Sequence, residues 1–312
     1  MLNRRTLIGV AAGAMLGLTA IGAQAADWKS QYPELVFAVV PSENAAGVVD
    51  RYTPFAEYLS KELGTKVTLR VANDYTAVIE GMKNKQIQIG FYGPGSYAKA
   101  YKVSDGNVEA FVTTVNQDGS IGYHSVMYVM AESMFKSIDD LKGKNLGMVD
   151  VESTSGFKAP SYYLQAEGKP VDKYFANAQV TGSHENAVIA LTQGTVDAAL
   201  NWWNSDIDSN LTRMLNKGML KKADGTAMTS QDFRVVWKSP LLAGSPYAYL
   251  NDMPPELKEA IQKAFVEAPQ KAPDAFAKLS DGKDKAFSPV THKDYEDFVK
   301  LNEWLETQRK SS

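Results

Sequence analysis

The segment Leu35-Val-Phe-Ala-Val-Val40 is followed by Tyr52-Thr-Pro-Phe-Ala-Glu-Tyr-Leu-Ser-Lys-Glu-Leu63 and then by Lys66-Val-Thr-Leu-Arg-Val71. The first and third stretches are rich in apolar and β-branched residues, which is typical of strands. The middle stretch has the periodicity of an amphipathic helix, and Gly64 ends it. A strand, a helix and a strand joined by short loops predict a βαβ unit with parallel strands.

The same alternation continues along the rest of the chain. Further strands are expected at Ile87–Tyr92, His124–Met130, Asn145–Val149, Ala178–Val180, Ala198–Leu200, Phe233–Trp237 and Pro246–Leu250. Further helices are expected at Thr76–Asn84, Ser96–Val103, Phe157–Ala166, Glu185–Thr192, Ser205–Asn216, Pro254–Val266 and Tyr295–Thr307. This repetition predicts an α/β fold with mainly parallel sheets.

The N-terminus has the features of a secretory signal peptide. Arg4-Arg5 supply the charge, Leu7–Ile21 form an apolar run, and Ala23-Gln-Ala25 is an A-x-A cleavage site. The apolar run is shorter than the ~20 residues that a membrane-spanning helix needs. We therefore expect residues 1–25 to be removed by cleavage after Ala25 and the mature protein to reside in a bacterial periplasm.

Composition excludes several classes of function. Cleavage would remove two of the 33 basic residues and none of the 36 acidic ones, which leaves a net charge of −5. An acidic chain without basic runs argues against nucleic acid and anionic membranes as partners. The chain has no cysteine, so it can form neither a disulfide nor a lipid-attached thiol. About 287 residues remain after cleavage, a length that is typical of a protein with two lobes.

A cluster of three hydroxyl residues is the first candidate binding feature. Ser153, Thr154 and Ser155 lie within Met148-Val-Asp-Val-Glu-Ser-Thr-Ser-Gly-Phe-Lys158, between an expected strand and an expected helix. Such residues cap a helix with their side-chain oxygens, and this is one interpretation of the cluster. The alternative is an oxyanion site, because a helix N-terminus offers free N–H groups and the positive end of the dipole.

Six segments resemble a known family. They are Asp74-Tyr75 with the helix to Glu80-Gly-Met82, Phe91-Tyr-Gly93, Asp118-Gly-Ser-Ile-Gly-Tyr123, Ser153-Thr-Ser-Gly156, Gly182-Ser-His-Glu185 and Val235-Val-Trp-Lys-Ser-Pro240. They occur in the same order as in the periplasmic phosphate, phosphite and phosphonate-binding components of ABC transporters, which the chain therefore resembles. The resemblance implies a type II periplasmic-binding-protein fold whose two lobes close on the ligand. It also implies delivery to an inner-membrane permease driven by a cytoplasmic ATPase.

The expected lobes are discontinuous in sequence. Residues 26–121 and 238–312 are assigned to the first lobe and residues 122–237 to the second. The two hinge crossings are expected near Gly122-Tyr123 and near Trp237–Pro240. No cofactor, metal or catalytic residue is expected, because a binding protein of this kind performs no chemistry. The protein is also expected to be a monomer.

The resemblance also implies the ligand contacts. The phosphonate head is expected to touch the following residues: Tyr75, Tyr123, Ser153, Thr154, Ser155 and His184. Tyr92 is a weaker candidate at the end of a strand, and could equally be a core or rim aromatic. We expect neutral dipoles rather than Lys or Arg to balance the anion, and Lys158 to point to solvent.

The opposite side of the expected pocket decides which tail, meaning the organic substituent on the phosphorus, the protein accepts. The aminoalkylphosphonate-binding branch of the family carries acids at two positions that here are Asn204 and Ser245. An unpaired ammonium in a closed pocket would be costly, which predicts weak binding of 2-aminoethylphosphonate unless Asp206 rescues it. Trp202 and its neighbour Trp203 can fill the remaining volume and favour a small head such as phosphite or methylphosphonate.

Two other functions stay open at the level of sequence. A binder of another small anion, such as a sulfonate or thiamine phosphate, could stack a ring on Trp202 or Trp203. A periplasmic phosphoester hydrolase is the less favoured alternative. The chain has no cluster of His, Cys and Asp at the spacing of metal ligands, no G-x-S-x-G elbow and no Walker-type Gly-Lys-Ser/Thr loop. Ser155 and His184 lack an evident third partner for nucleophilic catalysis.

Overall fold

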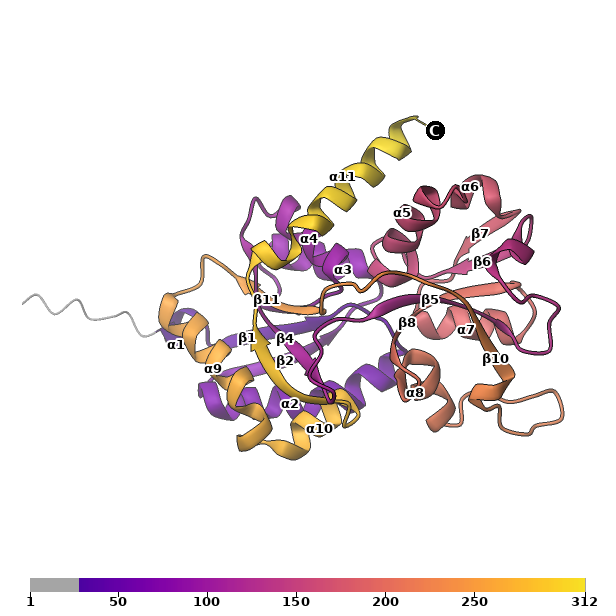
Figure 1. The fold of residues 1–312 in the computed structure, drawn as a ribbon. Helices are drawn as coiled ribbons and strands as arrows, with labels where there is room; N and C mark the ends of the chain where they lie inside the picture. The colour runs from indigo at the N-terminus through magenta and orange to yellow at the C-terminus, as the bar shows by residue number, and fades with distance from the viewer. Residues whose placement is uncertain (1–27, 312) are drawn as a thin grey trace, which may run out of the picture.

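Two α/β lobes lie side by side in the computed structural model, which describes residues 28–311 (Figure 1). The expected signal peptide and its cleavage after Ala25 therefore lie outside the described residues. Each lobe contains one sheet with helices packed on its faces. The expected two-lobed α/β fold is confirmed. Among the described residues, no helix combines the length and apolar character required to cross a bilayer.

The first lobe is built on a six-stranded sheet in the order β12-β4-β11-β3-β1-β2. Its strands are β1 (Glu34–Val39), β2 (Lys66–Val71), β3 (Ile89–Phe91), β4 (Val108–Asn116), β11 (Pro246–Leu250) and β12 (Asp284–Pro289). Strands β2, β1 and β3 are parallel, as the βαβ pattern predicts. The other three pairings are antiparallel, so the sheet is mixed around a parallel core.

The second lobe has the strand order β10-β5-β8-β6-β7, with β9 paired to β8. Its strands are β5 (His124–Met130), β6 (Asn145–Met148), β7 (Asn177–Val180), β8 (Ala198–Ser205), β9 (Asp208–Ser209) and β10 (Phe233–Lys238). Strands β8, β6 and β7 are parallel, whereas β5 and β10 are antiparallel to their neighbours.

Helices connect the strands and cover both sheets. They are α1 (Trp28–Gln31), α2 (Ala45–Leu63), α3 (Tyr75–Lys83), α4 (Pro94–Val103), α5 (Ala159–Ala166), α6 (Val171–Tyr174), α7 (His184–Thr192), α8 (Asn210–Asn216), α9 (Pro255–Lys271), α10 (Pro273–Ser280) and α11 (Glu296–Ser311). A π-helical turn at Thr154–Lys158 runs directly into α5. Short 3₁₀ turns lie at Ile138–Leu141, Ser230–Asp232 and His292–Tyr295.

The largest error of sequence interpretation concerns the segment after β8. The helix expected over Ser205–Asn216 begins only at Asn210, because β8 continues to Ser205 and Asp208–Ser209 return beside it as β9. Strands β4 and β12 were not predicted, although β4 alone spans nine residues. Both lie in the antiparallel part of the first sheet, which a search for βαβ units does not detect.

The chain passes between the lobes twice, after β4 and after β10. The two crossing segments pair with each other, because Tyr123 and Leu242 exchange backbone hydrogen bonds of 3.1 and 2.8 Å. Gly122 precedes this pair with φ of +127°, and a Cβ there would collide with the Leu242 carbonyl. Only glycine fits this backbone without strain.

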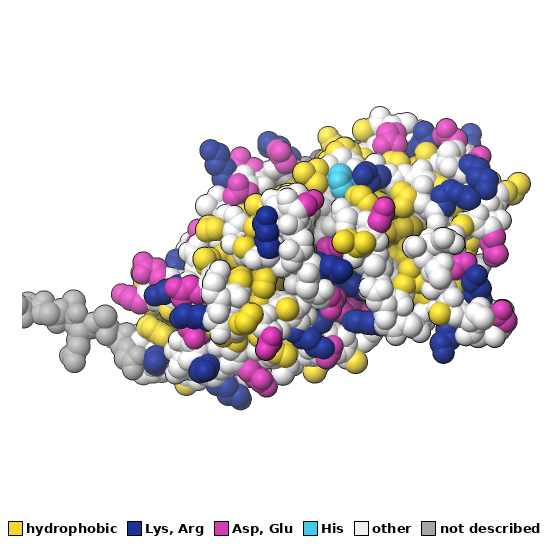
Figure 2. All heavy atoms as spheres, turned by 60° about the horizontal axis from the view of Figure 1, so that its bottom comes forward, with side chains coloured by type: hydrophobic (Ala, Val, Ile, Leu, Met, Phe, Trp, Pro, Cys, Tyr) yellow, Lys and Arg dark blue, Asp and Glu magenta, His cyan; other side chains and the backbone are white. Residues whose placement is uncertain are grey.

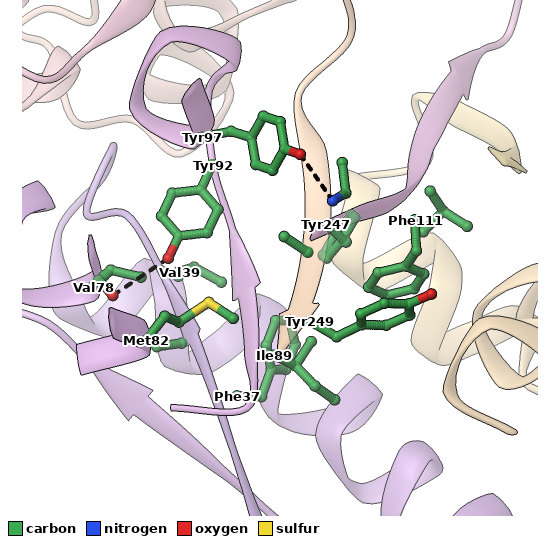
Figure 3. Packing of buried hydrophobic residues seen from close by; sticks show 14 of the residues in the cluster. Phe37, Val39, Val78, Met82, Ile89, Tyr92, Tyr97, Phe111, Tyr247 and Tyr249 are labelled. Atoms are coloured by element: carbon green, nitrogen blue, oxygen red, sulfur yellow. Dashed lines mark hydrogen bonds between the residues drawn. The ribbon is translucent and has the colours of Figure 1, made fainter. Parts of the chain in front are cut away.

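Aromatic side chains dominate the core of the first lobe. Phe265 packs edge-to-face against Phe55 and Phe111 with ring centroids 4.9 and 5.0 Å apart. Figure 3 shows Phe37, Phe111 and Tyr247 around the strands of this sheet. The same view shows that Tyr92 points into this core, where its hydroxyl donates to the carbonyl of Val78. These contacts make the first lobe a rigid wall for the site between the lobes.

Candidate functional site

A cavity of about 130 Å³ lies between the two lobes. This is smaller than the ~300–1,000 Å³ clefts that hold drug-sized ligands. Two groups of polar side chains line it. The first, here called the hydroxyl cluster, consists of Tyr75, Tyr123, Ser153, Thr154, Ser155 and His184. The second, here called the charged cluster, consists of Arg51, Asn204, Asp208, Arg213 and Asp284.

Four helix N-termini contribute residues to the cavity wall. Tyr75 is the first residue of α3, Gly93 is the N-cap of α4, and His184 is the first residue of α7. Ser153 caps the π-helical turn that continues into α5. Each helix presents the positive end of its dipole at its N-terminus. Their convergence makes the cavity suited to a small anion.

Hydroxyl groups line the wall beside these helix ends. The Ser153 hydroxyl accepts a hydrogen bond of 3.1 Å from Gly156 N, so it caps its helix as the sequence predicts. The same oxygen lies 3.4 Å from His184 Nε2. The Thr154 hydroxyl accepts from Gly95 N of the first lobe at 2.8 Å. Capping and interlobe contact thus involve the same side chains that face the cavity.

Burial keeps the two tyrosines of the hydroxyl cluster protonated. It raises the pKa of Tyr123 to about 12, against the opposing effect of hydrogen bonds from Thr154, Ser155 and Ser245. It raises the pKa of Tyr75 still further, although Ser153 opposes the shift through a hydrogen bond. Both side chains therefore present neutral hydroxyl donors at neutral pH.

His184 is a neutral imidazole in this site. The side chain is 3% exposed, and burial lowers its pKa to about 3 against a hydrogen-bond contribution from Asn201. Its Nδ1 has no hydrogen-bond partner within residues 28–311. A ring with so low a pKa is neutral at neutral pH and donates one hydrogen bond to an anion without adding charge.

The low pKa of His184 predicts a pH dependence of stability. Between pH 6.5 and 3 the unfolded chain binds a proton that the folded chain does not, so stability falls as the pH falls. Between pH 7 and 4.5 the wild type should lose on the order of 2 kcal/mol more unfolding free energy than His184→Gln. Urea denaturation at both pH values measures this, and equal losses in the two proteins would contradict it.

The charged cluster was missed by sequence interpretation, which expected neutral dipoles rather than Lys or Arg to balance the anion and named Asp206 as the one acid that could reach the pocket. Arg51 is 5% exposed and donates from Nη1 to Glu43 Oε1 at 2.7 Å. Arg213 lies on the ring of Trp202, with 4.7 Å between guanidinium carbon and ring centroid. Burial and the Asp208 carboxylate raise the pKa of Asp284 to about 7. These residues come from distant helices and strands, so no local motif marks them.

Charged side chains also join the two lobes beside the cavity. Arg213 Nε lies 3.0 Å from Asp281 Oδ2, and Lys217 Nζ lies 3.5 Å from Glu43 Oε2. Figure 2 shows blue and magenta side chains gathered where the two halves of the molecule meet. Each cation of the cleft therefore has an acidic neighbour, which lowers the net positive charge available to a ligand.

Tyr92 does not line the cavity, although it was a possible ligand contact. Its side chain is fully buried in the first-lobe core and its hydroxyl donates to Val78 O at 3.3 Å. Strand β3 ends at Phe91, one residue before Tyr92, and Phe91 rather than Tyr92 lines the cavity. The alternation of side chains along a strand turns Tyr92 to the opposite face.

Lys158 does not point to solvent as the sequence interpretation proposed. It is 3% exposed, and its Nζ donates to Gly95 O at 3.0 Å and to the Glu152 carboxylate. Burial lowers the pKa of Lys158, and Glu152 opposes that shift. The π-helical turn explains the error, because the extra residue per turn carries Lys158 toward α4 of the first lobe.

The other possible contacts lie at the cavity. Trp202, Asn204 and Ser245 all line it, whereas Trp203 does not. Arg213 covers the ring of Trp202, and Lys238 lies 4.5 Å from the ring of Trp203. Within residues 28–311, no group of three or more His, Asp and Glu side chains is arranged to hold a metal ion.

Comparisons with known proteins agree on one family. Residues 37–295 match the model of the family described as ABC transporter, phosphonate, periplasmic substrate-binding protein. The chain is 30% identical to the phosphonates-binding periplasmic protein of Escherichia coli K12 over 269 residues, which cover 85% of this chain and 75% of that protein. It is 29% identical to the phosphate-import protein PhnD of Mycolicibacterium smegmatis, covering 76% and 72% of the two chains.

Solved structures agree with the fold. A binding protein component of an ABC phosphonate transporter from Pseudomonas aeruginosa superimposes with a TM-score of 0.75 at 24% identity, covering 86% of this chain and 85% of that one. PhnD1 of Prochlorococcus marinus, solved with methylphosphonate, gives a TM-score of 0.71 at 18% identity, covering 88% and 98%. The family consists of binding proteins rather than enzymes. The chain belongs to the family of periplasmic substrate-binding proteins of phosphonate ABC transporters.

Proposed function

We propose that the chain captures a phosphonate or phosphite between its lobes, with the phosphorus oxyanion at the hydroxyl cluster. The observation that carries this is the convergence of four helix N-termini on one small cavity. Hydroxyl donors from Ser153, Ser155 and Tyr75 would bind the oxygens directly, and the N–H groups of the helix ends would add to them.

Binding without chemistry follows from the kind of groups present. The head would be held by neutral hydroxyls, one neutral imidazole and helix dipoles. Tyr75 belongs to the first lobe and Ser153 to the second, so the ligand gains its full set of contacts only when the lobes are closed. A ligand that binds the closed state better shifts the hinge toward it.

The later steps of transport are also part of the proposal. The closed, liganded protein would deliver its ligand to an inner-membrane permease driven by a cytoplasmic ATPase. We propose that it acts as a monomer, after cleavage behind Ala25, with residues 26–121 and 238–312 as one lobe and 122–237 as the other. The strand order supports these boundaries, because β4 and β5 belong to different sheets, as do β10 and β11.

A ring-bearing ligand such as thiamine phosphate is less compatible with the site. Arg213 already lies over one face of the Trp202 ring, and Trp203 does not line the cavity. The cavity of about 130 Å³ also favours a compact ligand. A sulfonate would share the head geometry but carries one charge fewer than a phosphonate dianion.

A calorimetric panel tests the proposed function. The mature protein is titrated with methylphosphonate, phosphite, methylsulfonate and thiamine phosphate at pH 7.5. The proposal predicts saturable one-to-one binding of methylphosphonate or phosphite, at least about tenfold tighter than either of the other two. Tightest binding of methylsulfonate or thiamine phosphate, or no binding of any phosphorus oxyanion, would refute it.

A contact between the lobes predicts a second effect on affinity. Glu185 Oε2 at the start of α7 accepts from the backbone N and the Nδ2 of Asn44, both at 2.8 Å. Glu185→Gln weakens these two bonds by removing the charge, which disfavours the closed state. The affinity for methylphosphonate should fall about 3–10-fold, measured by calorimetry.

Glu167→Gln provides the matched control for this variant. Glu167 also accepts two hydrogen bonds, from Trp237 Nε1 at 3.0 and 3.1 Å, but both residues belong to the second lobe. This variant should leave the affinity for methylphosphonate unchanged. Equal losses of affinity in the two variants would show that closure does not depend on the Glu185 contact.

A further inference from the structure

The charged cluster contains polar atoms without partners. Asp208 is 6% exposed, and its Oδ2 accepts from Asn204 Nδ2 at 2.7 Å, whereas its Oδ1 accepts no hydrogen bond. Among residues 28–311, Asn204 Oδ1 likewise accepts no hydrogen bond, whereas Arg213 Nε forms no hydrogen bond but is held in an ion pair, 3.0 Å from Asp281 Oδ2. All three residues line the cavity. A buried polar group without a partner costs roughly 1–3 kcal/mol, so these atoms favour a ligand that pairs with them.

The charged cluster offers a ligand two kinds of polar atom. Asp208 Oδ1 and Asn204 Oδ1 are acceptors without a hydrogen bond, and the guanidinium of Arg213 beside them is a donor whose Nε is ion-paired with Asp281. Arg213 Nη2 lies 3.8 Å from Asp208 Oδ1, so the donor and acceptor residues are neighbours. A hydroxyl group donates one hydrogen bond and accepts others, and it can therefore pair with both residues at once.

We propose that the charged cluster is a second subsite, which binds a hydroxyl group on the tail of a phosphonate whose head lies at the hydroxyl cluster. The ligand class is then the hydroxyalkylphosphonates. This inference rests on the proposed function, because it needs the head at Ser153, Thr154 and Ser155. It adds a specificity that the hydroxyl cluster alone does not supply.

Electrostatic interactions favour a hydroxyl as the tail group over the two charged alternatives, an ammonium and a carboxylate. An ammonium at Asp208 would lie beside the Arg213 guanidinium, which already stands 3.8 Å from that carboxylate. A carboxylate at Arg213 would face Asp208 and Asp281, the latter 3.0 Å from Arg213 Nε. Arg51 is occupied by Glu43 and by the Leu279 carbonyl, which accepts from its Nε at 3.0 Å and its Nη2 at 2.7 Å. A neutral group that both donates and accepts avoids the like-charge contacts.

Three phosphonates of equal size test the subsite. The n-propyl, 2-hydroxyethyl and 2-aminoethyl phosphonates differ only in a terminal methyl, hydroxyl or ammonium group. Titration of the wild-type protein should show 2-hydroxyethylphosphonate binding at least about tenfold tighter than both of the others. Equal affinities, or tightest binding of the propyl or aminoethyl compound, would overturn the inference.

Two further measurements distinguish a failure of the proposed function from a failure of the subsite. Methylphosphonate is titrated in parallel, and its failure to bind would refute the proposed function rather than the subsite alone. Asp208→Asn removes the charge of one acceptor at constant shape, and thermal unfolding verifies that the variant folds. The ratio of hydroxyethyl to propyl affinity should fall at least about fivefold in this variant. An unchanged ratio would contradict a role of Asp208 in binding the tail, and the ligand series in the wild type remains decisive if the variant does not fold.

Discussion

The Ser153→Ala variant should bind methylphosphonate about 10–100-fold more weakly than the wild type, because a hydrogen bond to a charged group contributes about 1.5–3 kcal/mol. The Ser153 hydroxyl faces the cavity at the N-terminus of the turn that leads into α5. It also interacts with Tyr75 and lies 3.4 Å from His184 Nε2. Its removal therefore affects three members of the hydroxyl cluster at once. Calorimetry at pH 7.5 measures the loss.

The loss of the helix cap must be separated from the loss of the ligand contact. Ser153 also accepts from Gly156 N, and removing an N-cap costs about 1 kcal/mol of stability. Thr229→Ala removes the cap of the 3₁₀ turn at Ser230–Asp232, which does not line the cavity. That variant should lose stability without losing affinity. Wild-type affinity in Ser153→Ala would contradict the assignment of the head to the hydroxyl cluster.

The Lys158→Met variant should lose about 3 kcal/mol of unfolding free energy, since breaking a buried ion pair leaves one charge without compensation. Lys158 is 3% exposed and the side chain of Glu152 is 12% exposed. The same ammonium donates to Gly95 O at the start of α4, so it also joins the second lobe to the first. Urea denaturation of both proteins at pH 7.5 measures the difference.

A more exposed lysine gives the comparison for Lys158. Lys99 Nζ lies 3.3 Å from Glu306 Oε1, and both side chains are about one-third exposed. Lys99→Met should cost less than about 1 kcal/mol, as exposed pairs usually do. The double variant Lys158→Met with Glu152→Gln should recover part of the lost stability, because no unpaired carboxylate remains. Equal losses in Lys158→Met and Lys99→Met would contradict the buried position of Lys158.

Local patterns predicted the parts of the fold that depend on local physics. The parallel strands β1 and β2 and the helix between them follow from hydrophobic periodicity and a terminal glycine, and the structure contains them. The N-cap role of Ser153 followed from its position between a strand and a helix. The chain leaves the first sheet between β4 and β5 and returns to it between β10 and β11.

Contacts between distant segments were the part that the sequence could not supply. The charged cluster combines Arg51 of α2, Arg213 of α8 and Asp284 of β12, which come together only through tertiary packing. Lys158 was assigned to solvent because an α-helical turn was assumed where a π-helical turn occurs. The search for acids in the pocket considered Asn204, Ser245 and Asp206, and thereby missed Asp208, which accepts a hydrogen bond from Asn204.

The most direct test is a crystal structure of the protein with methylphosphonate. Two positions for the phosphorus head compete, because the hydroxyl cluster and the charged cluster line the same cavity. We predict phosphonate oxygens within about 2.5–3.2 Å of the hydroxyls of Ser153, Ser155 and Tyr75. A head group bound instead by the guanidinium groups of Arg51 and Arg213 would contradict the assignment of the oxyanion to the four helix N-termini.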